Sequence, residues 1–232
     1  MKLATRRRRV RLPGGGAVSA VVALPVGFVA GRTPAVLLAH GAGADMTSPF
    51  LSAMHAGLAR AGYIAVKFNF AYTEARRRAP DPRKVLERTY RAVLDAVLAD
   101  RALRPPWAVI GGKSLGGRIA SYLAAADAPV RGVYFLGYPL HPAGRPDELR
   151  ADHLPSIRVP LLFVQGTRDA LCDLDRLRPV LAGLPRATLH TIEGGDHSFR
   201  VPRKQERDER AIWTEIVDTV ARWLGELEPP RG

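Results

Sequence analysis

Short apolar runs alternate with longer segments of helical periodicity over most of the chain, and this alternation constrains the fold more than any other feature. The short runs are rich in branched and aromatic residues and are predicted to be strands, at 35–39, 63–70, 107–110, 133–136, 160–165 and 188–192. Helices are predicted at 48–61, 81–98 and 210–227. In the clearest of these, Asp81 is placed as the N-cap and Pro82 at the first helical position. We expect a mostly parallel sheet with helices on both faces.

The N-terminal region combines a basic run at 6–9 with the apolar residues that follow it. Apolar side chains alternate with period two in 10–12 and 18–24, and the sequence Pro-Gly-Gly-Gly at 13–16 supplies a turn, so a β-hairpin is predicted. A secretory or twin-arginine leader also places a basic stretch before an apolar one. The apolar run here is broken by Pro25 and falls short of the ~20 residues needed to cross a bilayer. We therefore expect a hairpin, a cytoplasmic location and no membrane partner.

The composition is that of a folded globular protein, and it excludes several kinds of site. At 232 residues, of which 47% are hydrophobic and 25% charged, we expect a single domain over 1–232. The one cysteine, Cys172, cannot form an internal disulfide, and no cluster of Cys and His offers the ligands of a structural zinc. We expect no metal and no cofactor.

The net charge of +13 raises the question of a nucleic-acid partner. Thirty of the 35 basic residues are Arg, and they are spread over every segment of the chain. The densest runs, at 6–9 and 76–78, fit solvated charge as well as phosphate contacts. We therefore do not expect nucleic acid as the partner, and the sequence leaves the oligomeric state open.

The sharpest motif is G-K-S-L-G at 112–116, between a predicted strand and a predicted helix. A nucleophile at the tip of such a turn needs small residues two positions before and after it, because larger side chains would collide with the neighbouring strand and helix. Gly112 and Gly116 meet this need, so we assign Ser114 as a nucleophile. The same residues could end a phosphate-binding P-loop, but that motif requires Gly where Trp107 stands.

A serine nucleophile needs a base within hydrogen-bond reach and an acid that orients the base. Asp169 and His197 each follow a predicted strand, so both fall at the same sheet edge as Ser114. We assign Asp169 as the acid and His197 as the base. The other acidic residues near these positions, which fit a following helix or a turn better, are Asp173, Asp175 and Asp196.

Two backbone N–H groups are expected to hold the oxyanion that forms during acyl transfer. We assign the first to Leu115 and the second to Ala42, with Gly43 as the alternative, in the glycine-containing loop after the strand at 35–39. One donor of this kind lowers the barrier by roughly 3 kcal/mol. His40, at the start of the loop, is expected to pack or hydrogen-bond beneath it.

With these residues identified, the chain resembles the α/β-hydrolase superfamily of dienelactone-hydrolase type. More narrowly, it resembles the bacterial members of the group that includes a testis-expressed hydrolase-like protein and a subunit of the non-specific-lethal chromatin complex. The stretches that carry the resemblance are LLAHGAGADM, KFNFAYTEARRRAPDP, GGKSLGGRIAS, GYPLHPAGRPDELRADHL, VQGTRDAL and GGDHSF. The resemblance implies a sheet of seven or eight strands, no large lid and a triad of Ser114, Asp169 and His197.

The resemblance also implies a function. Dienelactone hydrolases proper carry Cys at the elbow, whereas this chain has Ser114, so we expect a serine hydrolase of small ester-type substrates rather than lactone chemistry. The stretch 139–160 is short where other relatives insert lids, which predicts a shallow site for short acyl chains. Arg76, Arg77 and Arg78 follow the carboxyl end of a strand, and they fit either solvated charge or a place at its mouth, where they would favour anionic substrates. Because the chromatin-associated relative is regarded as a scaffold, the alternative function is a non-catalytic interaction scaffold.

Overall fold

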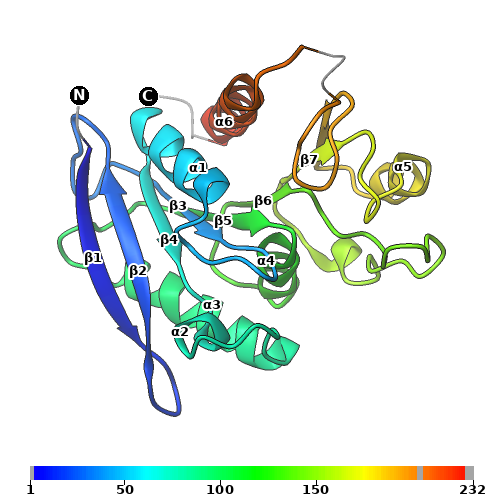
Figure 1. Ribbon diagram of the computed structural model, residues 1–232. Coiled ribbons are helices and arrows are strands. Elements are labelled where there is room, and N and C mark those ends of the chain that lie inside the picture. The colour runs from blue at the N-terminus through cyan, green and yellow to red at the C-terminus, as the bar shows by residue number, and fades with distance from the viewer. Residues whose placement is uncertain (1–2, 203–205, 228–232) are drawn as a thin grey trace.

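Eight strands form one sheet at the centre of the protein, shown in the computed structural model of Figure 1, which describes residues 3–202 and 206–227. The strands are β1 (Ala4–Arg11), β2 (Ala17–Leu24), β3 (Ala35–Ala39), β4 (Ile64–Phe68), β5 (Ala108–Lys113), β6 (Gly132–Leu136), β7 (Leu161–Gly166) and β8 (Ala187–Ile192). Their order across the sheet is β1-β2-β4-β3-β5-β6-β7-β8. β2 pairs antiparallel with β1 and β4, and every other neighbouring pair is parallel. The predicted mostly parallel sheet is confirmed.

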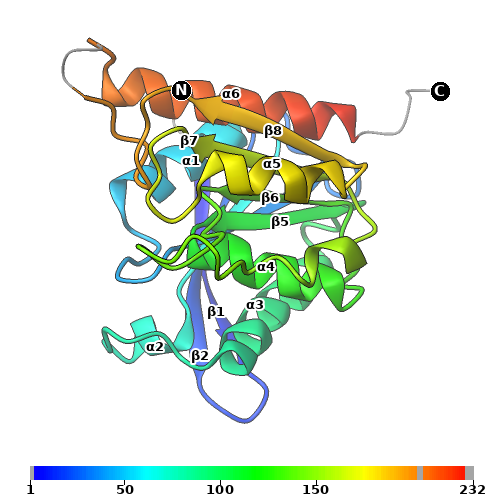
Figure 2. The same cartoon turned by 90° about the vertical axis from the view of Figure 1, so that its right-hand side faces the viewer.

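Helices cover both faces of this sheet (Figures 1 and 2). One face packs against α1 (Pro49–Arg60) and α6 (Glu209–Glu226), and the other against α3 (Arg83–Leu98), α4 (Leu115–Ala125) and α5 (Leu174–Ala182). Successive residues of β3 enter opposite cores, since Val36 and Leu38 lie in the first and Leu37 in the second. A strand buried on both faces must be apolar at every position, which explains why such runs were visible in the sequence.

The N-terminal hairpin extends the sheet at one edge. β1 and β2 pair along their full length, with Val10 opposite Val18. β1 begins earlier than the apolar alternation indicated, so the basic run at 6–9 lies on an exposed edge strand, where Arg9 pairs with Glu74 at 2.6 Å. Charged side chains on an edge strand oppose its pairing with another chain. None of the helices in residues 3–202 and 206–227 has the length and apolar character needed to cross a membrane.

The helix predicted at 81–98 begins later than expected. α3 starts at Arg83, and Pro82 rather than Asp81 occupies the N-cap position. The Asp81 carboxylate instead accepts a hydrogen bond of 2.5 Å from Arg77. A guanidinium is a charged donor and binds a carboxylate more strongly than a backbone amide does, which accounts for the difference. Two elements too short to show a periodicity were not predicted, namely α2 (Ala71–Glu74) and a 3-10 helix (Leu154–Ser156).

The parallel register brings the carboxyl ends of the central strands to one edge of the sheet (Figure 2). The last residue of β3, Ala39, pairs with Gly112 of β5, and the last residue of β7, Gly166, pairs with Ile192 of β8. The residues singled out in the sequence follow these strand ends and therefore gather on one side of the molecule.

Candidate active site

Ser114 stands at a sharp turn between β5 and α4. β5 ends at Lys113 and α4 begins at Leu115, so a single residue separates strand from helix. Ser114 has φ 50° and ψ −113°, a backbone conformation that residues with a Cβ rarely adopt. Such strain persists only where the surrounding structure imposes it, and it concentrates at functional sites. The Ser114 N–H donates to the carbonyl of Leu136 at 3.1 Å, which fixes the turn against β6.

The two glycines that flank this turn allow it to approach β3. A Cβ on Gly112 would lie 2.2 Å from the carbonyl oxygen of Ala39, and one on Gly116 would lie 2.4 Å from the same oxygen. Both distances are far inside van der Waals contact, so neither position accepts a side chain unless the backbone moves. Gly112 also has φ +154°, which L side chains rarely adopt.

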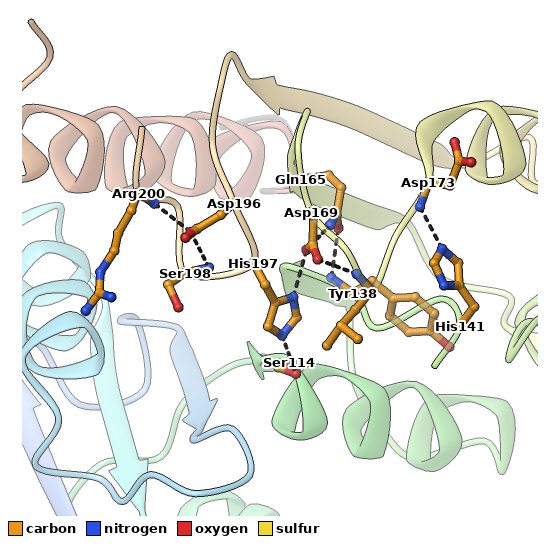
Figure 3. Close-up of polar contacts among 11 residues, drawn as sticks. Ser114, Tyr138, His141, Gln165, Asp169, Asp173, Asp196, His197, Ser198 and Arg200 are labelled. Carbon is orange, nitrogen blue, oxygen red and sulfur yellow. Dashed lines mark hydrogen bonds and ion pairs between the residues drawn. The ribbon is translucent and has the colours of Figure 1, made fainter. Parts of the chain in front are cut away.

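A hydroxyl, an imidazole and a carboxylate form a continuous hydrogen-bonded chain next to this turn (Figure 3). His197 Nε2 lies 2.8 Å from Ser114 Oγ, and His197 Nδ1 lies 2.7 Å from Asp169 Oδ2. Because an ionised carboxylate only accepts hydrogen bonds, Nδ1 carries the donated proton and Nε2 can accept the Ser114 O–H. In this arrangement the imidazole can take the proton of a serine nucleophile. The structure thus brings together the three side chains that the sequence motifs singled out.

Asp169 is buried and accepts three hydrogen bonds. Besides His197, its Oδ2 accepts from Gln165 Nε2 at 2.6 Å, and its Oδ1 accepts from the Leu171 N–H at 2.8 Å. Gln165 Oε1 in turn accepts from the Tyr138 N–H at 2.8 Å. Sequence reasoning did not identify Gln165, although a lone amide in an otherwise apolar strand, four residues before Asp169, was a signal that it has a buried polar partner.

The other acidic residues near these loops bond locally. Asp173 caps α5, because its Oδ1 accepts the Asp175 N–H at 2.9 Å. Asp196 Oδ1 accepts two backbone N–H groups of the turn at 198–200, at 2.8 and 2.9 Å. Asp169 is therefore the carboxylate that contacts the imidazole.

Most of the chain matches a known protein family. The Alpha/beta hydrolase domain family matches residues 32–225, most of the chain. The chain belongs to the alpha/beta hydrolase family.

Solved structures of similar proteins agree with this assignment. A dienelactone hydrolase from Anabaena variabilis is 20% identical, with a TM-score of 0.75 over 97% of this chain and 99% of that one. A serine hydrolase without a lid from Xanthomonas campestris is 19% identical, with a TM-score of 0.73 over 98% and 97%. Est1E from Butyrivibrio proteoclasticus is 14% identical, with a TM-score of 0.73 over 95% and 98%. At these identities the likeness establishes the fold alone, and it confirms the predicted α/β-hydrolase fold without a large lid.

In this member of the alpha/beta hydrolase family, two backbone N–H groups near Ser114 donate to no acceptor in the described part of the chain. Leu115 is the first residue of α4, where an N–H has no partner within the helix. Ala42 lies in the loop after β3 and lines the cleft with Ser114, and its N–H donates to no acceptor in the described part of the chain. The alternative, Gly43, is not among the described residues that line the cleft.

His40 supports this loop from within the protein. Its Nδ1 donates to the carbonyl of Gly41 at 2.9 Å, and its Nε2 accepts from the Phe70 N–H at 3.2 Å. Burial lowers the pKa of His40, so the ring is neutral, as one donating and one accepting nitrogen require. The expectation that His40 hydrogen-bonds beneath the loop is confirmed.

A cleft of about 480 Å³ opens over Ser114 and His197. Phe50 and Trp213 line it with aromatic surface and contact each other edge to face, with ring centroids 5.8 Å apart. Arg200 and Glu209 also line it, and their exposed side chains bring one positive and one negative charge to the rim. The cleft therefore combines an apolar wall with a charged rim.

Arg76, Arg77 and Arg78 are not among the described residues that line this cleft. They are exposed in the loop after α2, where Arg77 bonds to Asp81. The prediction that they lie at the mouth treated β4 as leading directly to the site, but the turn of α2 comes between. The structure instead brings the charge of Arg200 to the cleft.

A second serine–histidine contact joins α4 to the 139–160 stretch. Ser121 Oγ is 2.7 Å from His153 Nε2, but Ser121 is fully buried and its hydroxyl donates to the carbonyl of Arg118 at 2.7 Å. Because the Ser121 hydroxyl donates to Arg118, the ring of His153 donates to Ser121 Oγ, and burial lowers the pKa of His153 to about 4, which makes it a weak base. The contact therefore anchors the 139–160 stretch. In residues 3–202 and 206–227, no group of three or more His, Cys, Asp or Glu side chains is arranged to hold a metal ion.

Proposed function

We propose that the protein is a serine hydrolase that cleaves small acyl esters, with Ser114 as nucleophile, His197 as base and Asp169 as the acid that orients His197. The observation that carries this proposal is the unbroken hydrogen-bonded chain from Ser114 Oγ to the buried Asp169, with contacts of 2.8 and 2.7 Å. We further propose that residues 1–232 form a single domain.

In the first half of the reaction, Ser114 Oγ attacks the carbonyl carbon of the ester while its proton moves to His197 Nε2. The carbonyl oxygen becomes an oxyanion and accepts hydrogen bonds from the N–H groups of Leu115 and Ala42, each lowering the barrier by about 3 kcal/mol. The intermediate collapses, the bond to the leaving oxygen breaks, and His197 gives that oxygen the proton. An alcohol departs, and the acyl group remains on Ser114.

In the second half, a water molecule gives a proton to His197 and its oxygen attacks the acyl carbon. The oxyanion forms again at the same two amides. When it collapses, the bond to Ser114 Oγ breaks and His197 returns the proton to the serine, so a carboxylic acid departs. Asp169 stays ionised throughout and stabilises the imidazolium. Side chains of this chain carry every proton, so the proposed reaction requires no cofactor.

The shape of the cleft supports small substrates with short acyl chains. A volume of about 480 Å³ suits a small molecule, and the stretch between β6 and β7 contains a 3-10 helix of three residues instead of a lid. Similar structures include a dienelactone hydrolase and the esterase domain of a Rhodothermus marinus protein. We propose that this chain is of dienelactone-hydrolase type and groups with the bacterial relatives named above, with Ser114 favouring esters.

Hydrolysis of p-nitrophenyl acetate and butyrate tests this proposal. We expect turnover by the wild type and a loss of at least about 1,000-fold in Ser114→Ala, because the variant has no nucleophile. Ser121→Ala is the matched control: it removes the other serine–histidine contact and should keep most of the activity.

A fluorophosphonate probe supplies a second readout that does not depend on the choice of ester. Mass spectrometry should find the label on Ser114 of the wild type and none on Ser114→Ala. Equal ester turnover by these two proteins would overturn the proposal. A folded wild type that neither hydrolyses esters nor reacts with the probe would also overturn it, and would favour a non-catalytic interaction scaffold.

A further inference from the structure

Lys113 directly precedes Ser114, and its side chain ends beside the imidazole of His197. The side chain first passes the loop after β3, where its Cγ lies 3.6 Å from the point that a Cβ on Gly41 would occupy. A Cβ on Gly137 would lie 3.0 Å from Lys113 Nζ, 3.4 Å from the His197 carbonyl oxygen and 3.6 Å from His197 Cε1. The ammonium group and the edge of the imidazole therefore border the same small space above Gly137.

This ammonium group is buried without a hydrogen-bond partner among the described residues. Asp169, after β7, and Asp196, after β8, attract it but form no ion pair with it. On the loop after β3, the ring of His40 accepts the Phe70 N–H. Burial lowers the pKa of Lys113 to about 8, because the attraction of the two carboxylates offsets only part of the lost hydration. At neutral pH the group is mostly charged.

Phe199 covers this ammonium group from a strained backbone position. Its ring centroid lies 5.4 Å from Lys113 Nζ, within the range of a cation–π interaction. The residue is fully buried and has φ 63°, in the left-handed region that bulky residues rarely adopt. An unpaired charge and a strained backbone, each unfavourable for stability, thus meet beside His197.

We propose that Lys113 is a positioning residue that acts through His197: its buried positive charge beside the imidazole disfavours protonation of the ring in the free enzyme. The inference rests on the proposed function, in which His197 must be neutral to accept the Ser114 proton. Like charges repel, and the burial of the Lys113 ammonium group limits how far water can screen its charge from the ring. The charge therefore keeps Nε2 available as a base at lower pH than Asp169 alone would allow.

The same charge has a smaller effect on the reaction itself. In the transition state the imidazolium forms together with the oxyanion, and the net charge of the two is zero. A nearby cation repels the first and attracts the second, so its effects partly cancel. We therefore expect the acidic limb of the pH–rate profile to depend on Lys113 more than the plateau rate does.

The test compares kcat/KM for p-nitrophenyl acetate against pH in the wild type, Lys113→Met and Lys113→Arg. Lys113→Met should move the acidic limb to higher pH by about one unit, because the ring no longer has a positive charge beside it. The variant should also unfold at a higher temperature, because it lacks an unpaired buried charge. Lys113→Arg retains the charge and should leave the limb near its wild-type position. Lys113→Gln is a second neutral variant in case Met disturbs packing. A limb that stays in place in both neutral variants, or that moves equally in Arg, overturns the proposal.

A measurement without catalysis separates this inference from the proposed function. In Ser114→Ala protein, the His197 ring can be titrated by NMR with Lys113 present and with Lys113→Met added. The midpoint should rise by about one pH unit in the double variant. If the wild type cleaves no ester while this midpoint moves, the proposed function fails and the effect of the Lys113 charge stands. An unmoved midpoint overturns the inference whether or not the protein is an esterase.

Discussion

Gln165 and His197 bind the same oxygen of Asp169. Gln165 Nε2 donates to Oδ2 at 2.6 Å, and His197 Nδ1 donates to it at 2.7 Å. The Gln165 amide is itself oriented, because its Oε1 accepts the Tyr138 N–H at 2.8 Å. Since Gln165 and the Asp169 side chain are both buried, removal of one link leaves its partners unsatisfied. The orientation of the imidazole thus depends on a side chain near the end of β7.

Gln165→Leu should weaken both the fold and the reaction. The substitution leaves the Tyr138 N–H without its acceptor and Asp169 with one donor fewer, so the free energy of unfolding should fall by about 1–3 kcal/mol. A carboxylate free to shift also misplaces the imidazole, and kcat should fall up to about 100-fold. Urea unfolding and p-nitrophenyl acetate turnover measure the two effects. Wild-type turnover in a correctly folded variant would contradict the role given to this amide.

Gly116→Ala should lower stability and esterase activity far more than a Gly→Ala substitution elsewhere in a helix. The new Cβ would lie 2.4 Å from the Ala39 carbonyl oxygen, so the elbow must move away from β3 and the Ser114 hydroxyl with it. Gly225→Ala in α6 is the matched control, because a Cβ there meets nothing within 4 Å. It should raise stability by no more than about 0.5–1 kcal/mol, because Gly225 is next to the last residue of α6 and the preference for Ala over Gly applies fully only inside a helix. Thermal unfolding and esterase assays of both variants test the contrast, which fails if Gly116→Ala retains wild-type activity.

The parts of this protein that were predictable from the sequence have local signals. The run at 35–39 matches β3 from end to end, because a strand buried on both faces must be apolar throughout. The sharp turn at Ser114 was recognisable from its two flanking glycines, because steric contact with β3 excludes side chains at Gly112 and Gly116. Asp169 and His197 follow strands whose carboxyl ends must share an edge in any parallel sheet.

The features that were not predictable depend on contacts between distant segments. Lysine side chains usually lie exposed, but that of Lys113 is buried where the loops after β3, β6 and β8 come together. Asp is a common N-cap residue, but the carboxylate of Asp81 accepts a hydrogen bond from Arg77 instead. The loop at 76–78 follows the short helix α2, whose four residues leave no periodic pattern, so its distance from the cleft could not be inferred.

His55 should make the fold sensitive to acid. It is buried in α1, where its Nε2 lies 3.1 Å from the carbonyl oxygens of Val21 and Ala65. Burial, and then the charge of Lys67, lower the pKa of His55 from 6.5 to about 4. Between these values the unfolded chain binds a proton that the folded protein does not. The contribution of His55 to stability is therefore complete above pH 6.5 and falls as the pH drops toward 4, by up to about 3 kcal/mol.

Urea unfolding at pH 7 and pH 4.5 tests this expectation in the wild type and in His55→Gln. The wild type should lose more stability than the variant between the two pH values, because Gln does not titrate. The difference between the two proteins is the informative quantity, since the other two histidines whose pKa is lowered by burial, His40 and His153, contribute equally to both. An identical pH dependence would show that His55 is not responsible.

Arg200→Gln should change which esters are cleaved. Arg200 lines the cleft, so its guanidinium can attract a carboxylate on the substrate while leaving a neutral ester unaffected. At an exposed position such an interaction contributes about 1 kcal/mol, so KM for p-nitrophenyl hemisuccinate should rise roughly five-fold and KM for p-nitrophenyl acetate should stay the same. Arg78→Gln removes the same charge from the loop after α2 and should alter neither value. If KM for the hemisuccinate ester rose in Arg78→Gln and not in Arg200→Gln, the arginines at 76–78 would be the ones that attract anionic substrates. Loss of activity toward both esters in Arg200→Gln would show that Arg200 supports the structure of the site. A charge that only attracts a carboxylate on the substrate would not change the hydrolysis of the neutral ester.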